Sequence, residues 1–315
     1  MLDFASRSWT HPAVILVATD LSDLDRLMPY AFDEAAETGA RLILLHALTP
    51  ISAVTADAVG MPYYDPAGAL DIADKMLRPW CEAAGRRDIR CDPLVREGNA
   101  TQQIAAAIRQ FHADRVMLGT RSRGKLGKLL LGSVAEQVLR SVNLPVITVG
   151  PEAHLQAESG SRQRIVLHAT TLRETSRPSA ALACRIAADR RAKLVLLHVL
   201  PPVAEMERQG LPTGFDSTAM RELCSLAADT GAGGGISVEP VVVHGNPSIE
   251  ILAEAAARRA SLIVLGATHR SAFENLTRDR TVYRVLAHAR CPVLTLREPQ
   301  PARVEEREER VAVHY

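Results

Sequence analysis

A segment rich in glycine and basic residues joins an apolar run ending at Gly119 to an amphipathic stretch that opens with Gly132 and Ser133. A glycine has no Cβ, so its backbone N–H can approach an anion closely. A helix starting at Ser133 adds unpaired N–H groups and the positive end of its dipole, and the Ser133 hydroxyl could bind a phosphate or a metal ion. Between them lie four cations, Arg121, Arg123, Lys125 and Lys128. This spacing predicts a phosphate site.

A second polar group follows another apolar run, in the sequence Ala18-Thr19-Asp20. If the strands over 13–19 and 114–119 are neighbours in a parallel sheet, the loops after them flank one crevice. Asp20 would then accept hydrogen bonds from a ribose or a base. The alternative is a basic surface loop in which Ser133 and Asp20 only cap helices or turns. Neither a Walker A sequence nor a G-x-G-x-x-G motif after a strand occurs in this sequence.

Five short runs of Val, Ile and Leu alternate with helical patterns in the first half of the chain. Such runs are typical of parallel strands buried on both faces, and the stretches between them repeat apolar residues at helical spacing. Ser22 or Asp23 is expected to cap the first of these helices and Gly39 to end it. The order predicts an α/β fold with a doubly wound, five-stranded parallel sheet. The predicted strands cover 13–19, 41–48, 89–96, 114–119 and 145–149.

The same blocks recur in the second half of the chain in the same order. The segment 41–48 matches 193–200, while Gly98-Asn99 matches Gly245-Asn246 at an offset of 147. An ordered repeat of this kind indicates two copies of one domain. We therefore predict four parts: a first domain at 1–150, a linker at 151–162, a second domain at 163–297 and a charged tail at 298–315.

With these motifs the sequence resembles the universal stress protein family over nearly its whole length, as a tandem pair. The family signature is G-x-x-G, nine residues, then G-[ST]; Gly119, Gly132 and Ser133 fit it, and Ser122 replaces the second glycine. The segments 129–140 and 17–22 are also similar to the family. The resemblance implies flavodoxin-like domains with strands one and four adjacent. It also implies binding of ATP or another adenine nucleotide, with Mg²⁺.

Carried over to matching positions, the resemblance implies a nucleotide site in the first domain. Asp20 would contact the adenine or ribose, Ala47 at the end of the second strand would line the adenine pocket, and backbone and hydroxyl groups near Gly132 would hold the phosphates. The Ser122 side chain is expected to weaken this binding. The implied site comprises Ala18, Thr19, Asp20, Ala47, Gly119, Arg121, Ser122, Arg123, Gly132, Ser133 and Val134.

The second copy has lost most of these groups. Asp279 would place a carboxylate where the phosphates lie, and this repels a polyphosphate, although neighbouring arginines partly offset the repulsion. We expect no ATP binding in the family mode there, and a role in structural pairing or partner recognition. The alternative is that the arginines hold a different anion. The replacements are Thr171 for Asp20, His269 for Ser122, Asp279 for Gly132 and Arg280 for Ser133.

The fifth strand of each copy, at 145–149 and 292–296, is apolar and is expected to lie at a sheet edge. Bare apolar edges promote association unless they are covered. In the family these strands pair antiparallel, so the two copies are expected to form an intramolecular pseudo-dimer. The sequence leaves open whether two chains then associate as a homodimer.

Composition excludes several classes of protein. The 37 Lys and Arg balance 36 Asp and Glu, so no global field attracts nucleic acid or a membrane surface. No apolar run reaches the length of a membrane span, and none at the start suggests a signal peptide. The five cysteines form no C-x-x-C pair and are interpreted as small buried hydrophobes in a reduced, cytoplasmic protein. His46 and His198 are expected to be hydrogen-bonded strand-end histidines rather than metal ligands.

The function predicted from these observations is that of a nucleotide-responsive stress protein. ATP would order the loop 121–131 and bias a surface that binds a protein partner, which the sequence does not identify. One alternative is a slow ATPase or phosphotransfer enzyme at the same site, although no catalytic residue can be assigned. The other is an interaction module that binds no nucleotide.

Overall fold

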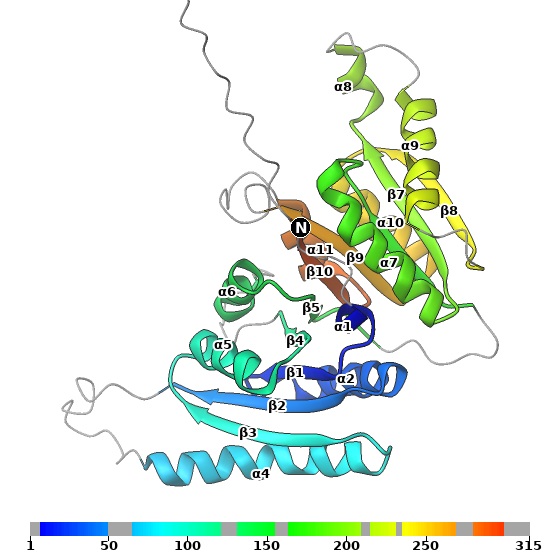
Figure 1. The fold of residues 1–315 in the computed structure, drawn as a ribbon. Helices are drawn as coiled ribbons and strands as arrows, with labels where there is room; N and C mark the ends of the chain where they lie inside the picture. Colours follow the sequence, from blue (N-terminus) through cyan, green and yellow to red (C-terminus); the bar gives the residue numbers. More distant parts are fainter. Residues whose placement is uncertain are drawn as a thin grey trace, which may run out of the picture.

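The computed structural model describes residues 7–49, 65–120, 131–154, 163–208, 215–230, 235–268 and 280–298. Strands and helices alternate along both halves of the chain (Figure 1). The first half contains α1 (Arg7–Thr10), β1 (Val14–Thr19), α2 (Leu24–Thr38), β2 (Arg41–Leu48), α4 (Pro66–Gly85), β3 (Cys91–Glu97), α5 (Ala100–Phe111), β4 (Arg115–Gly119), α6 (Ser133–Ser141) and β5 (Val146–Val149).

The second half repeats this order with a few additions. It contains β6 (Ile165–Ala169), the 3₁₀ turn η1 (Glu174–Ser176), α7 (Arg177–Asp189), β7 (Lys193–Leu200), α8 (Val203–Arg208), α9 (Phe215–Asp229), β8 (Val238–His244), α10 (Pro247–Arg258), β9 (Leu262–Thr268), α11 (Arg280–His288) and β10 (Val293–Glu298). The last strand therefore runs two residues beyond the predicted segment 292–296.

Each half forms a doubly wound parallel sheet, as the sequence predicts. The strand order is β3-β2-β1-β4-β5 in the first domain and β8-β7-β6-β9-β10 in the second. The winding changes direction between β1 and β4, which are parallel neighbours with Ala18 opposite Leu118. The predicted adjacency of strands one and four is confirmed, and a ligand crevice in such a sheet lies at the carboxyl ends of these two strands.

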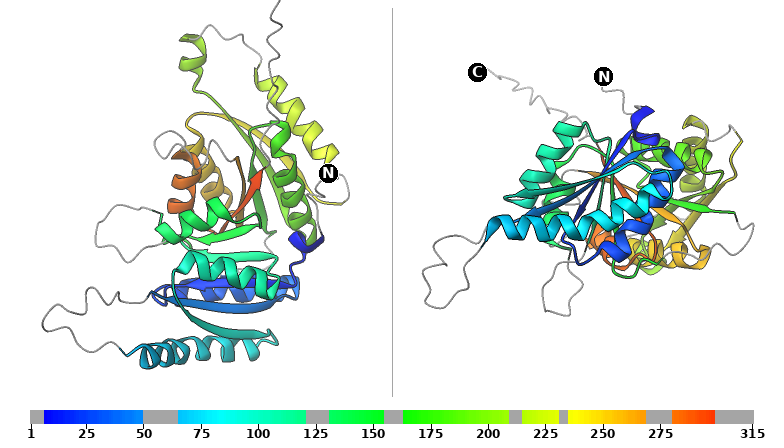
Figure 2. Two further views of the ribbon diagram at one scale, coloured as in Figure 1. Left: turned by 60° about the vertical axis from the view of Figure 1, so that its left-hand side comes forward. Right: turned by 90° about the horizontal axis from the view of Figure 1, so that it is seen from below.

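The two domains join into one ten-stranded sheet through β5 and β10, which pair antiparallel. Val293 lies opposite Thr148, and Thr295 lies opposite Val146. Figure 2 shows the two domains meeting edge to edge along these strands. The pairing satisfies the backbone groups of both apolar edges, so the predicted intramolecular pseudo-dimer is confirmed.

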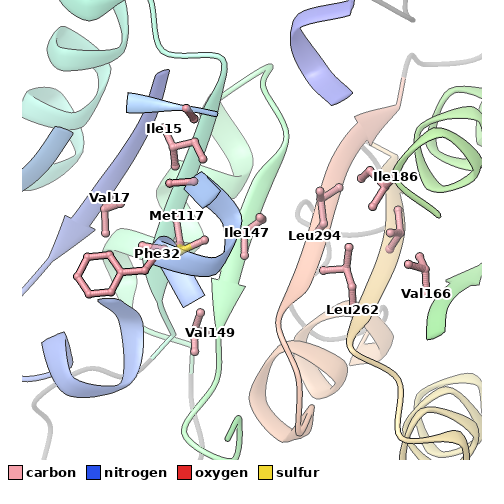
Figure 3. Packing of buried hydrophobic residues seen from close by; sticks show 14 of the residues in the cluster. Ile15, Val17, Phe32, Met117, Ile147, Val149, Val166, Ile186, Leu262 and Leu294 are labelled. Atoms are coloured by element: carbon pink, nitrogen blue, oxygen red, sulfur yellow. The ribbon is translucent and has the colours of Figure 1, made fainter. Parts of the chain in front are cut away.

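Two hydrophobic layers cover the two faces of this sheet, and each layer contains residues of both domains. On one face Ile147 of β5 and Leu294 of β10 lie on the adjoining strands of the junction (Figure 3). Trp9 and Trp80 pack against the margin of the same layer. The helices over the described residues include none that is long and apolar enough to span a membrane.

The outermost strands, β3 and β8, leave one edge of each domain unpaired within the sheet. Each carries a proline at the matching position, Pro93 opposite Leu44 and Pro240 opposite Leu196. A proline has no N–H to donate and is tolerated on edge strands, where it limits further pairing.

A buried ionic cluster links the domains next to the junction. Arg115, at the start of β4, is fully buried and pairs with Glu34 of α2. Arg190, at the end of α7, reaches Glu34 at 2.6 Å and Glu37 at 2.8 Å. Arg164, ahead of β6, also pairs with Glu37. The cluster therefore crosses from the first domain to the second at three ion pairs.

The charge state of Glu34 follows from this arrangement. Burial by itself raises the pKa of Glu34, but the guanidinium groups of Arg190 and Arg115 outweigh burial and hold the pKa below its ordinary value. The carboxylate is thus charged and pairs with two cations, of which Arg115 has no exposed surface.

We expect Glu34→Gln to lower the free energy of unfolding by about 3–5 kcal/mol, because it leaves buried cations without their partner. Urea unfolding of the full chain measures the change. The matched control is Asp71→Asn, which removes an exposed partner of Lys75 at 2.5 Å and costs less than about 1 kcal/mol.

The contribution of Glu34 to the free energy of unfolding decreases on acidification. Because the pKa of Glu34 is lower in the folded chain, its contribution to stability is complete above the ordinary value of 4.5 and is lost as the pH falls through the lower folded value. Equal costs for the two variants, or a cost for Glu34→Gln that does not shrink on acidification, would contradict this assignment.

Candidate functional site

The carboxyl ends of β1, β2 and β4 bring together several residues of the predicted site. Ala18 and Thr19 end β1, with Thr19 opposite His46 of β2 and Ala18 opposite Leu118 of β4. Asp20, directly after β1, and Gly119, the last residue of β4, therefore lie at the carboxyl edge of the sheet, where this fold places a ligand crevice. Their predicted roles toward a nucleotide stay predictions, whereas their proximity is a feature of the fold.

A tight turn after β1 presents Asp20. The N–H of Leu21 donates to the Thr19 hydroxyl at 2.9 Å, and Leu21 has a left-handed φ of 73°. The Oδ1 atom of Asp20 accepts from the Ser22 N–H at 2.9 Å and from the Ser22 hydroxyl at 2.6 Å. Asp20 is half-buried, and among the residues that the structure describes its Oδ2 atom has no hydrogen-bond partner. One carboxylate oxygen is thus held in place, while the other makes no hydrogen bond within the described part of the chain.

Asp23 contributes to this site, although the sequence predicts it only as a helix cap. Asp23 is the N-cap residue of α2, as predicted, but it forms no side-chain cap bond, and the Ser22 hydroxyl binds Asp20. The buried Asp23 carboxylate instead accepts from the Thr19 hydroxyl at 2.6 Å. The predicted end of α2 at Gly39, with a left-handed φ of 72°, is confirmed.

The Asp23 carboxylate also gives a reason for glycine at position 119. A Cβ on Gly119 would lie 2.0 Å from Asp23 Oδ2, far inside contact distance, so only glycine leaves room for this acid beneath the crevice. Burial raises the pKa of Asp23, and the nearby charge of Asp20 acts in the same direction, while the Thr19 hydroxyl and Arg26 lower it.

The start of α6 is bonded to the residue that follows β4. The Gly132 N–H donates to the Thr120 carbonyl at 2.9 Å, and the Thr120 N–H donates to Val149 at 3.2 Å. Gly132 is therefore engaged within the protein, and it anchors the two ends of the loop together. The first intrahelical bond is made by Glu136, and no side chain caps the helix. The N–H groups of Ser133 and Val134 thus have no intrahelical acceptor.

Of the remaining predicted residues, only Ala47 lies in the described part of the chain. Ala47 is half-buried at the next-to-last position of β2, one residue beyond His46. Arg121, Ser122 and Arg123 lie outside the described residues, as do the other loop cations, Lys125 and Lys128.

The second domain repeats the turn but not its acid. The N–H of Leu172 donates to the Thr170 hydroxyl at 3.1 Å, and Leu172 is left-handed with φ 59°. Thr171 stands at the position of Asp20, and its hydroxyl is 2.9 Å from that of Ser176. Replacement of the acid by a neutral hydroxyl is thus a difference between two otherwise matching turns. The predicted differences at His269 and Asp279 lie outside the described residues, as does the Arg280 side chain.

The strand-end histidines are hydrogen-bonded, as predicted. Nδ1 of His46 lies 2.9 Å from the Thr19 carbonyl, and Nδ1 of His198 lies 2.9 Å from the Thr170 carbonyl. These bonds tie each β1-type turn to the adjacent strand. Among the described residues, no three His, Cys, Asp or Glu side chains are placed to hold a metal ion.

The interpretation of all five cysteines as small buried hydrophobes is wrong for three of them. Cys184 and Cys291 are buried, whereas Cys224 is exposed and Cys81 and Cys91 are half-buried. Burial raises the pKa of Cys291 to about 12, as expected for a thiol enclosed in apolar surroundings.

The fold defines a tandem pair of doubly wound α/β domains, a class in which ligands bind at the strand switch. The universal stress protein family model matches residues 13–150 and again residues 163–297. The chain belongs to this family.

Named relatives agree with this assignment. A universal stress protein of Mycolicibacterium smegmatis is 27% identical over 303 residues, covering 90% of this chain and 96% of that protein. One of Thermus aquaticus is 34% identical over 139 residues, covering 43% of this chain and 96% of that protein. The crystal structure of a universal stress protein from Archaeoglobus fulgidus has a TM-score of 0.69 at 18% identity and covers 93% of this chain and 98% of its own; it shares the fold.

We expect Gly119→Ala to destabilise the chain by about 1–3 kcal/mol, because the new methyl group displaces the buried Asp23 carboxylate. In the double variant with Asp23→Ala the space is free, and the combined cost should fall short of the sum of the single costs by at least about 1 kcal/mol. Urea unfolding of the four proteins measures this coupling, and strictly additive costs would refute the contact.

Proposed function

We propose that this stress-response protein binds an adenine nucleotide, with ATP and Mg²⁺ as the expected form, in the crevice of the first domain. The observation that carries the proposal is the convergence of Asp20 and the uncapped start of α6 on the β1–β4 switch point. A carboxylate suits ribose or adenine donors, and free N–H groups at a helix start suit phosphate.

Each group has a defined part in this proposal. The available oxygen of Asp20 accepts from the ribose or the base, while Ala18, Thr19 and Ala47 line the adenine end. The N–H groups of Ser133 and Val134 and the Ser133 hydroxyl hold phosphate oxygens. Gly132 contributes by keeping the start of α6 against Thr120. Mg²⁺ would be held chiefly by the phosphates.

The loop between Thr120 and Leu131 would transmit nucleotide binding to the surface that binds a protein partner. Both of its ends are fixed, since Gly132 is bonded to Thr120. Its arginines, Arg121 and Arg123, would close over the phosphates, and Ser122 would weaken this closure. A nucleotide would then change the surface around the loop, through which a protein partner is bound. We propose that the protein acts as a regulator of this kind.

The second domain is proposed to bind no nucleotide in this mode. Thr171 cannot supply a carboxylate, and Asp279 would repel the phosphates. Its part is to complete the sheet at β5 and to provide surface for a partner.

We expect Asp20→Ala to weaken nucleotide binding by about 10- to 100-fold, since a hydrogen bond to a charged group contributes about 1.5–3 kcal/mol. Calorimetric titration of the full chain with Mg-ATP measures the change. Thr171→Ala is the matched control, because it removes the corresponding side chain of the second domain and should leave the affinity unchanged. An unchanged affinity in Asp20→Ala would refute the site.

We expect Gly132→Asp to abolish saturable ATP binding by the full chain, because it introduces the carboxylate that the second domain carries at this position. Mass spectrometry of the denatured protein identifies any nucleotide that co-purifies with the wild-type chain and is absent from the variant. Binding that persists in a folded Gly132→Asp protein would place a nucleotide in the second domain. Phosphate release that disappears with the same substitution would favour the slow ATPase instead.

A further inference from the structure

A pair of thiols lies on the outer side of the first domain, away from the crevice. Cys81, in the last turns of α4, and Cys91, the first residue of β3, have their sulfur atoms 2.6 Å apart. Both cysteines are reduced in this structure and half-buried. Sulfur atoms in a disulfide are about 2.04 Å apart, so a bond between these two needs a movement of about half an ångström.

The fold builds this contact rigidly. After α4 the chain reverses within a few residues, held by bonds from Arg87 and Ile89 to the Ala84 carbonyl at 2.8 and 3.1 Å. Asp88 adopts a left-handed φ of 58° in this turn. The reversal returns the chain to β3 with Cys91 beside Cys81.

The helix that carries Cys81 is anchored on both sides of it. Leu77 and Ala84, one turn before and nearly one turn after, are fully buried. Trp80 packs on Phe32 of α2 with ring centroids 6.5 Å apart. The two sulfur atoms are therefore placed together by the core of the domain rather than by a mobile side chain.

Small polar molecules can reach the pair. Both cysteines line an open recess of about 680 Å³ at the amino ends of β2 and β3, together with Arg41, Arg90 and Asp92. The ion pair between Arg41 and Asp92, at 2.7 Å, lies at the same recess. Cys184 differs, because it is buried and lies beside the Thr230 hydroxyl at 3.2 Å.

The pair belongs to the first domain only. In the strand register Cys91 faces Leu42, and the matching position opposite Leu194 in the second domain is Val238. The repeated fold therefore does not require a cysteine at this position, because valine occupies the matching position in the second domain.

We propose that Cys81 and Cys91 form an oxidation site, at which hydrogen peroxide or another hydroperoxide converts the two thiols into an intramolecular disulfide between α4 and β3. This site is independent of the nucleotide crevice, which lies at the opposite, carboxyl edge of the same strands. Its product fixes the outermost strand of the sheet to the helix that covers it.

The oxidation of the two thiols proceeds in two steps. The Cys81 thiolate attacks one oxygen of hydrogen peroxide, the O–O bond breaks, and the departing hydroxide takes up a proton to leave as water. The Cys91 sulfur then attacks the Cys81 sulfenic acid, the S–O bond breaks, and a second water leaves with the Cys91 proton. Two thiols lose two electrons, which the O–O bond accepts, and the products are one disulfide and two waters.

The hydrogen bond with Cys81, followed by burial, raises the pKa of the Cys91 thiol. Because the thiolate is the nucleophile, Cys91 gives up this proton as its sulfur attacks the Cys81 sulfenic acid.

The test treats the reduced full chain with a small excess of hydrogen peroxide, blocks remaining thiols with N-ethylmaleimide and digests without reductant. Trypsin separates the two cysteines into peptides 76–86 and 91–96. We expect these peptides joined by a disulfide, with dithiothreitol restoring both free thiols. We also expect the link to form before the exposed Cys224 is consumed, and the thermal midpoint of the oxidised chain to rise.

Three variants separate the outcomes. Cys224→Ser should form the 76–86/91–96 link as the wild type does, whereas Cys81→Ser and Cys91→Ser should form none and show no rise in the thermal midpoint on oxidation. The wild-type result stands even if a serine variant fails to fold, because it needs no substitution. The proposal is overturned if Cys81 and Cys91 are both blocked by N-ethylmaleimide after oxidation, if Cys224 reacts first, or if Cys81 is found linked to another cysteine.

Discussion

The antiparallel pairing of β5 with β10 is the contact on which the rest of the molecule depends. Each of these strands ends a parallel sheet, and the residues through which they pair, 146–148 of β5 and 293–295 of β10, include no charged side chain that would keep the two edges apart. Their pairing turns two incomplete sheets into one and makes each hydrophobic layer continuous across the junction. It also brings the end of α7 against α2, where Arg190 shares Glu34 with the buried Arg115.

Because each domain is internally parallel, the antiparallel junction points the two sets of strands in opposite directions. The carboxyl edge of the first domain, with Asp20, therefore lies on the side where the second domain has the amino ends of its strands. A further contact between the domains joins Oε1 of Glu152, just past β5, to Nδ1 of His288 at the end of α11, at 3.0 Å. Two sites of the same kind would lie at opposite ends of the sheet, so one crevice can be lost without disturbing the other.

Much of the fold could be predicted because it depends on local patterns. The predicted strand segments match every strand of the first domain to within two residues, although β3 interrupts its apolar residues with Asp92, Pro93 and Arg96, and Gly39 marks the end of α2. The duplicated blocks predict two domains, and the resemblance to a known family adds the adjacency of β1 and β4. The bonds of His46 and His198 to the preceding turns follow from their shared position at a strand end.

Other features depend on the direction of a side chain or on residues far apart in the sequence. Asp23 stands where a helix cap is expected, but its carboxylate turns inward to Thr19 and fills the space beneath Gly119. Arg115 and Glu34 are 81 residues apart, and no spacing rule connects them. Cys81 and Cys91 meet only because a short reversal after α4 has a left-handed Asp88, which their ten-residue separation does not reveal.

The fusion of two copies in one chain has an evolutionary consequence. In a symmetric dimer of identical subunits every substitution occurs twice, so a change that abolishes one crevice abolishes both. Here the partner of β5 is encoded separately, and selection can preserve the apolar residues of β10 while it relaxes on the turn after β6. Thr171 in place of Asp20 is a difference of the kind that this arrangement permits, while β5 and β10 stay paired.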